Sequence, residues 1–140
     1  MAIVNHPVTT PLSYKVGTLS AAVTGSSDTD TLSPQVNEIT FVPATQSGTW
    51  TGIGGNVVSD QSIATWNATL GMIQDVAATG MLRWLLTNEG KKATFTALLT
   101  TGVTVTFIAT ISPAQIGGAV APGYLTSTVT LAMDGKPVFS

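Results

Sequence analysis

The chain contains no cysteine and only one histidine, His6. The absence of cysteine excludes disulfide bonds, thiolate metal sites and cysteine nucleophiles. Catalytic triads and histidine-based zinc sites need a histidine held beside a rigid partner. His6 lies instead in an extended N-terminal segment that Pro7 and Pro11 keep from forming a helix. We therefore expect no catalytic residue and no metal-binding residue in this chain.

Charged residues are also scarce, at 9% of 140 residues, whereas a typical globular domain has about 25%. The net charge is −2, so the chain has no basic surface with which to grip nucleic acid. A soluble monomer needs a charged exterior. A chain this poor in charge is expected to be covered by copies of itself.

Long hydrophobic runs are missing as well. No stretch of 18 apolar residues occurs, which argues against a transmembrane helix and against membrane insertion. The N-terminus lacks the basic region and the apolar core of a signal peptide. We expect a product that stays in, or is assembled in, the cytoplasm that made it.

Two short motifs have the look of ligand sites but are incomplete. Asp28-Thr-Asp30 has the alternate carboxylates of a calcium loop without the acid at the twelfth position. Gly52-Ile-Gly54-Gly55 resembles a phosphate loop, but Val57 stands where the dinucleotide fingerprint needs glycine, and no Lys-Ser/Thr pair follows. Both are expected to be turns, and no cofactor is predicted.

What the chain does have is threonine, 24 residues of it, with 44% hydrophobic residues. Threonine favours strands because its branched Cβ packs well on a pleated surface. Alternation of apolar and neutral polar residues predicts strands over 14–23, 36–42, 63–72, 93–99, 103–111 and 124–133. One amphipathic helix is predicted over 80–90. The fold class is mainly β, a single domain built as a β-sandwich or barrel flanked by one α-helix.

The predicted helix is apolar over an arc of about 200°, wider than the stripe of about 100° on an ordinary surface helix. One part of this arc can pack on the sheet of its own subunit. The remainder makes Met81, Trp84 and Leu85 candidates for contact with another subunit.

Residues 43–62 form a predicted long irregular loop, and loops of this length are usually functional or disordered. The loop contains Trp50 and Ile53, which a merely solvated linker would not need. Residues 1–13 are predicted to be extended and could be a free arm.

Several segments together resemble one protein family. They are Gly48-Thr-Trp50 with Gly52, Gly54 and Gly55, the strand with Trp66 and Leu70, Gln74-Asp75, the helix ending Asn88-Glu-Gly90, the strands 94–99 and 103–111, the turn Ser112-Pro-Ala-Gln-Ile-Gly-Gly118, and the closing 128–137 with Asp134-Gly-Lys-Pro137. The chain is similar in these segments to the tail tube (major tail) proteins of long-tailed bacteriophages, above all the short versions in phages of actinobacteria. Contractile-tail tubes and the type VI secretion tube share that fold.

The resemblance implies subunits that close into rings, usually hexameric, and stack head to tail around a lumen. The lumen first houses a tape-measure protein and then conducts DNA into the host, while other tail proteins bind the tube ends. Residues 43–62, with Trp50, Ile53, Gly54 and Gly55, would be the loop between rings. Residues 1–13 and 138–140 would be arms. Such a protein is located in the virion tail and is not an enzyme.

A net negative chain suits a DNA conduit, because a lumen that repels phosphate lets DNA slide. Glu38 is a candidate for facing the lumen because it shares a strand face with Thr40. Two alternatives stay open. One is another β-sandwich virion protein, such as a capsid decoration or tail-completion protein. The other is a carbohydrate-binding β-sandwich that uses Trp50 or Trp66 to stack on a sugar.

Overall fold

The computed structural model describes residues 2–9, 11–12, 17–100, 102–120 and 122–140. The strands in this part of the chain are β1 (Thr18–Val23), β2 (Asp30–Thr31), β3 (Val36–Ala44), β4 (Ser47–Thr51), β5 (Val57–Gln61), β6 (Thr65–Ile73), β7 (Lys92–Thr100), β8 (Val103–Thr110), β9 (Thr126–Met133) and β10 (Val138–Phe139). They are joined by a 3₁₀ turn, η1 (Ser33–Gln35), and a helix, α1 (Met81–Thr87). The predicted class, mainly β with one flanking helix, is confirmed.

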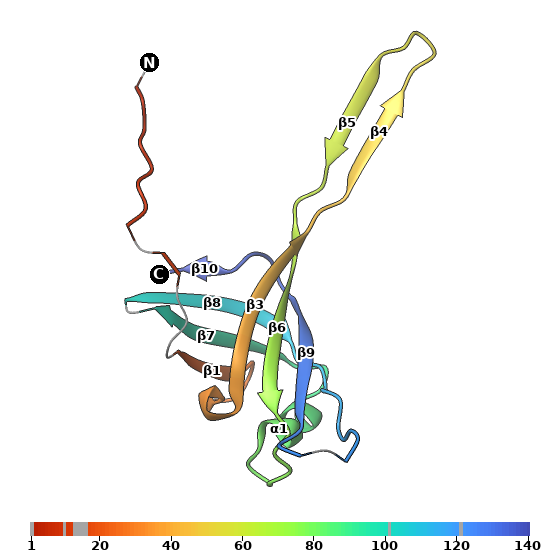
Figure 1. The fold of residues 1–140 in the computed structure, drawn as a ribbon. Coiled ribbons are helices and arrows are strands. Elements are labelled where there is room, and N and C mark those ends of the chain that lie inside the picture. Colours follow the sequence, from red (N-terminus) through yellow and green to blue (C-terminus); the bar gives the residue numbers. More distant parts are fainter. Residues whose placement is uncertain (1, 10, 13–16, 101, 121) are drawn as a thin grey trace.

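Eight strands form an antiparallel sheet in the order β2-β1-β7-β8-β9-β6-β3, with β10 also paired to β8. β8 and β9 share only the pairs Ala109↔Met133 and Thr110↔Ala132. The sheet folds over at this short junction, so that β3, β6 and β9 cross β1, β7 and β8 steeply (Figure 1). The result is a sandwich whose two layers face each other across one core.

The core is made by the alternation seen in the sequence. On β7 the residues from Ala93 to Leu99 alternate between buried and more exposed positions. Phe95 and Phe107 are directly opposite each other on β7 and β8, and their rings stack with centroids 5.0 Å apart. Phe41 of β3 meets Phe107 edge-on from the other layer, also at 5.0 Å. These aromatic contacts join the two layers, and each adds about 0.5–1.5 kcal/mol beyond the area it buries.

The outer faces of both layers carry few charged side chains, Glu38 on β3 and Lys92 on β7 among them. The register aligns Thr40, Thr69 and Thr130 across β3, β6 and β9. Likewise Ser20, Thr96 and Thr106 lie side by side across β1, β7 and β8. Threonine is therefore the characteristic residue of the surface of this sandwich, in the places where a monomer commonly carries lysine and glutamate.

α1 lies at one end of the sandwich (Figure 1). It ends at Thr87, three residues before the predicted boundary, and Gly90 follows with φ +81°. Met81, Leu82 and Leu85 are buried in the core of their own subunit. Much of the wide apolar arc is thus covered by the core of the chain itself.

Two predicted segments are different in the structure. Residues 43–62 are not an irregular loop: β3 and β6 extend into a β4–β5 hairpin that projects from the sandwich (Figure 1). The C-terminal residues 138–140 are not a free arm, since β10 pairs with β8 and Ser140 exchanges backbone hydrogen bonds with Thr104. The first strand begins at Thr18, and the predicted positions 14–16, like Met1, Thr10 and Ser13 of the arm, lie outside the described residues.

Candidate assembly surfaces

The hairpin is exposed on both faces, since all ten residues of β4 and β5 are solvent-accessible. Alternation along the strands puts Trp50 opposite Val58, with side chains 62% and 57% exposed, on one face. The opposite face carries Thr49 and Ser59, also a direct pair. Val57, 59% exposed, lies on this second face as well, so both faces carry an exposed apolar side chain, and neither face has a partner within the described part of this subunit.

The tip of the hairpin is a five-residue turn, 52–56, closed by hydrogen bonds from Gly52 N to Asn56 O (2.8 Å) and from Gly55 N to Gly52 O (2.9 Å). Gly55 has φ +85°, a conformation that strongly favours glycine. Gly54 and Gly55 thus act through the backbone, and they present Ile53 as the fully exposed side chain of the tip.

A β-bulge joins the hairpin to the sandwich. Between the pairs Ala44↔Thr65 and Ser47↔Gln61, one strand has two residues and the other has three. The Ser62 backbone N–H donates to Gln46 O at 2.8 Å, and the Ser62 hydroxyl accepts from Gln46 N at 3.1 Å. Bulges bend and twist a ribbon, so this one sets the direction in which the hairpin leaves the sheet.

The helix residues proposed for subunit contact behave differently from the hairpin. Met81 and Leu85 are 2% and 0% exposed, so in the isolated subunit neither side chain reaches the surface. Trp84 is half-buried: its ring meets Phe95 edge-on at 6.3 Å, and its Nε1–H donates to Asp30 Oδ2 at 2.9 Å. Leu86, which the sequence did not single out, is the apolar helix residue that reaches solvent.

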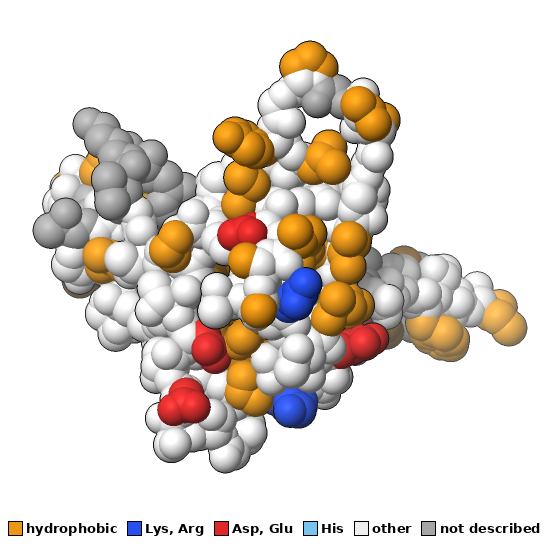
Figure 2. Space-filling model, turned by 90° about the horizontal axis from the view of Figure 1, so that it is seen from below, with side chains coloured by type: hydrophobic (Ala, Val, Ile, Leu, Met, Phe, Trp, Pro, Cys, Tyr) orange, Lys and Arg blue, Asp and Glu red, His pale blue; other side chains and the backbone are white. Residues whose placement is uncertain are grey.

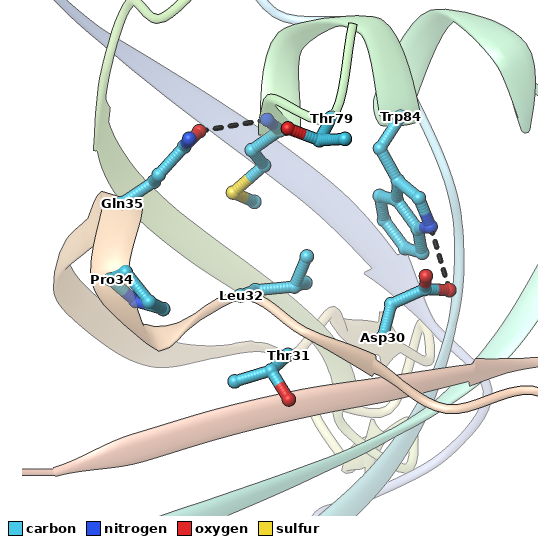
Figure 3. Close-up of a pocket in the computed structure, with 8 residues that line it drawn as sticks. Asp30, Thr31, Leu32, Pro34, Gln35, Thr79 and Trp84 are labelled. Atoms are coloured by element: carbon cyan, nitrogen blue, oxygen red, sulfur yellow. Dashed lines mark hydrogen bonds between the residues drawn. The ribbon is translucent and has the colours of Figure 1, made fainter. Parts of the chain in front are cut away.

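A pocket of about 200 Å³ lies between η1, β2 and the start of α1 (Figure 3). The side chains of Asp30 and Gln35 in this pocket already have hydrogen-bond partners. Gln35 Oε1 accepts from the Met81 backbone N at 2.7 Å, and Gln35 Nε2 donates to Asp75 Oδ2 at 3.0 Å. Gln35 thus caps the first turn of α1 from 46 residues away, where Gly80 has no side chain to do so. The hydrogen bonds of Gln35 hold the start of the helix in place. No sequence pattern pointed to this role of Gln35.

Glu38 lies exposed on the outer face of β3, and Thr40 Oγ1 donates to its Oε1 at 3.4 Å. The face around it is the threonine-rich face of β3, β6 and β9. The N-terminal arm is also exposed, with Ile3, Val4 and Val8 more than 70% accessible. His6 lies in this arm.

No group of three or more potential metal ligands is found among the described residues. In the same part of the chain, no helix has the length and apolar character to cross a membrane. The polar contacts described above hold the subunit together, and none of them joins a base to a nucleophile.

No protein-family model matches the sequence, and no curated protein sequence matches it either. Solved structures, in contrast, share the fold. A chain in the cryo-EM structure of the anti-feeding prophage baseplate aligns over 95% of this chain and 97% of its own, with a TM-score of 0.58 and 10% identity. A chain in the extended-state sheath/tube terminator of PVC, an extracellular contractile injection system, aligns over 96% and 99%, with a TM-score of 0.58 and 14% identity.

A chain from the tail of an empty GTA particle aligns over 88% of this chain and 94% of its own, with a TM-score of 0.55 and 15% identity. Identities this low establish a shared fold alone. Over nearly its whole length, the chain has the fold of subunits found in tail and contractile injection assemblies.

Proposed function

We propose that this chain is a tail tube (major tail) protein of a phage-like particle. It is a structural protein without enzymatic activity, and its copies form rings that stack into the tube. The observation that carries the proposal is the structural match, which spans both this chain and the tail and injection-system subunits almost end to end. The threonine-rich outer faces and the projecting hairpin supply what such an assembly needs, namely large surfaces to be covered by other copies.

The ring is proposed to be hexameric, in keeping with the six-fold symmetry of the baseplate and of the GTA tail among the neighbours. Its lumen houses the tape-measure protein during assembly and conducts DNA afterwards, without binding a particular sequence. Glu38, on a face with no basic residue among its neighbours Thr40, Gly71 and Thr128, is the proposed lumen-facing acid. A neutral-to-acidic wall does not trap phosphate by counterion release.

Electron microscopy of the purified chain in negative stain, across a concentration series, tests this proposal. Hollow rings or tubes that appear as concentration rises are the expected result, because association of copies follows mass action. A monodisperse monomer at every concentration, including after addition of a preformed tail-tip complex, would contradict it.

The hairpin is the proposed contact between rings, with Trp50, Ile53, Gly54 and Gly55 as its contact and turn residues. Replacing both Trp50 and Ile53 with Asp is expected to leave a folded subunit and to prevent stacking, since neither side chain belongs to the core. Circular dichroism checks the fold and electron microscopy counts tubes. Tubes as long and as frequent as in the wild type would remove the hairpin from the stacking interface.

A second candidate is a tail-completion subunit that binds an end of the tube. It is favoured by the fact that two of the neighbours belong to a baseplate and to a sheath/tube terminator. A completion subunit forms one ring and stops. Single rings that never stack at high concentration, but that bind the end of a preformed tube, would support this candidate over the tube itself.

A further inference from the structure

β10 covers part of one edge of β8 (Figure 1). The Ser140 backbone N donates to Thr104 O at 2.8 Å, and Thr104 N donates to Ser140 O at 3.2 Å. Val138 pairs with Thr106, two residues along each strand. Since alternate pairs of an antiparallel ladder exchange both hydrogen bonds, Val138 and Thr106 form the second such pair. β10 therefore satisfies the backbone groups of Thr104 and Thr106 that point away from β7.

β10 is needed on this edge because β9 covers only one end of it. β9 is paired with β8 at Ala109 and Thr110 alone. Asp134 N, directly after β9, donates to Ile108 O at 2.8 Å. Within the described part of the chain, β10 is the only strand that pairs with the rest of this edge. Detachment of β10 would leave the edge open over residues 103–107.

The edge under β10 has a sequence that pairs readily with other chains. From Val103 to Thr110, β8 reads Val-Thr-Val-Thr-Phe-Ile-Ala-Thr, and all of these residues except alanine favour strands. The strand has no charged residue, no proline and no glycine. Uncharged segments of this kind, about six or seven residues long, form sheets between chains when they are exposed. An open β8 edge would therefore be a site of association.

Other parts of the molecule are protected by charge or by proline. β2 and β3, the strands at the two ends of the sheet order, carry the acids Asp30 and Glu38, and β3 also contains Pro43. Seen from below, the α1 end of the molecule likewise shows acidic and basic side chains among the neutral ones (Figure 2). Natural sheets protect an edge with charges, with proline or with a covering segment. β8 has neither of the first two, so its protection is β10.

β10 is held mainly through its backbone. Val138 and Phe139 are 58% and 67% exposed, so their side chains are not part of the core. An exposed backbone hydrogen bond contributes little to stability because water replaces it. Short segments at the margin of a fold open locally while the rest of the protein stays folded. β10 can therefore detach from β8 without unfolding the sandwich.

We propose that β10 is a guard strand that closes the uncharged edge of β8 in the single subunit and, on detachment, opens it to the same edge of a second copy. Two copies of one edge run antiparallel when a two-fold axis relates them, and such an isologous contact closes as a dimer. β10 thus keeps the subunit from pairing through β8. This guard role goes beyond the proposed tube function and does not depend on it.

Two proline variants at neighbouring positions test this role. Val138→Pro removes the N–H that Val138 directs at Thr106, whereas the Phe139 N–H points away from β8, so Phe139→Pro removes no hydrogen bond between the two strands. Loss of one backbone hydrogen bond raises the detached fraction by about fivefold. Because both copies must open, the dimer of Val138→Pro is expected at a concentration lower by about 25-fold. Phe139→Pro is expected to behave as the wild type.

Deletion of residues 137–140 opens the edge permanently and is expected to give a dimer. Thr106→Lys in the same deletion variant is expected to restore the monomer, because a lysine on an edge prevents pairing. Restoration distinguishes pairing through β8 from general destabilisation, which a lysine would not repair. Light scattering after size-exclusion chromatography measures the mass, at concentrations below those at which rings or tubes form. Circular dichroism and thermal melting establish that each variant is folded.

A deletion variant that stays monomeric, or one whose association persists with Thr106→Lys, would overturn the guard role. Equal association of Val138→Pro and Phe139→Pro would overturn it too. Neither result bears on the tube function, because the masses are measured below the concentration at which copies assemble. Conversely, a wild-type chain that forms no tubes at any concentration would remove the tube function and leave the guard role in place.

Discussion

At the scale of single residues, Trp84 illustrates how the chain uses its few polar groups. The sequence marked Trp84 as a candidate for contact with another subunit, whereas in the structure its indole N–H donates to Asp30 and its ring packs on Phe95. The bond joins residues 54 positions apart. No local pattern encodes such a partnership, and for this reason the sequence alone could not assign it.

Trp84→Phe is expected to destabilise the subunit by about 1.5 kcal/mol, because the hydrogen bond to a carboxylate is lost and Asp30 stays half-buried without that donor. Urea unfolding followed by circular dichroism measures the change. Trp50→Phe is the matched control, and its free energy of unfolding should lie within about 0.5 kcal/mol of the wild type, since the side chain is exposed. Equal stability of the two variants would show that the bond to Asp30 contributes nothing measurable.

Gly80 and Gly90, on either side of α1, are glycine for different reasons. Gly80 lacks the space for a side chain, and Gly90 has a backbone conformation that side chains disfavour. A Cβ at Gly80 would lie 2.6 Å from Asp75 O and 3.1 Å from Ala77 O, and these backbone atoms cannot move freely. Gly90 has open space around its Cβ position but has φ +81°. We expect Gly80→Ala to cost about 2–3 kcal/mol through overpacking and Gly90→Ala about 1 kcal/mol through backbone strain. Chemical denaturation ranks them, and the reverse order would contradict this interpretation.

At the scale of elements, the regular part of the fold was predictable from the sequence and the hairpin was not. The strands around Phe95 and Phe107 were found because one face is buried, and burial imposes apolar alternation. The hairpin has no buried face, so its residues carry no such pattern, and the Gly-rich tip and the bulge at Ser62 look like loop. β10 was missed because two residues held by backbone pairing leave no periodicity to read.

The helix was located correctly, but its wide apolar arc was explained differently. The sequence suggested that a second subunit covers Met81 and Leu85, and in the structure the core of the same subunit buries them. The arc width shows how much of a helix is covered and does not show by which chain. Burial of the helix by its own subunit can be distinguished from burial by another subunit only once the topology is known, here the turn of the sheet between β8 and β9.

The hairpin should be dispensable for folding and required for assembly. Replacing residues 45–64 with Asn-Gly joins the paired residues Ala44 and Thr65 through a two-residue turn, the type that hairpins favour. The urea midpoint is expected to be unchanged or higher, because a shorter loop costs less closure entropy, while tubes disappear from electron micrographs. An unfolded product would show instead that the hairpin supports the sandwich.

At the scale of the whole molecule, the scarcity of charge decides what kind of force holds copies together. With 9% charged residues, threonine on the outer faces of both layers and apolar side chains at both ends, most of the surface available for contact is uncharged. Exposed ion pairs between copies contribute only about 0–1 kcal/mol. Apolar burial should therefore dominate association.

Titrations with two different salts distinguish apolar burial from ion pairing as the force that holds copies together. Raising sodium chloride from about 0.1 M to about 1 M shortens the screening length from about 10 Å to about 3 Å, and we expect it to change the concentration at which tubes form by less than about fivefold. Ammonium sulfate at equal ionic strength should lower that concentration clearly, because sulfate strengthens apolar burial. Light scattering follows both series. Tubes that dissolve in sodium chloride would instead assign the assembly to charge pairs between copies.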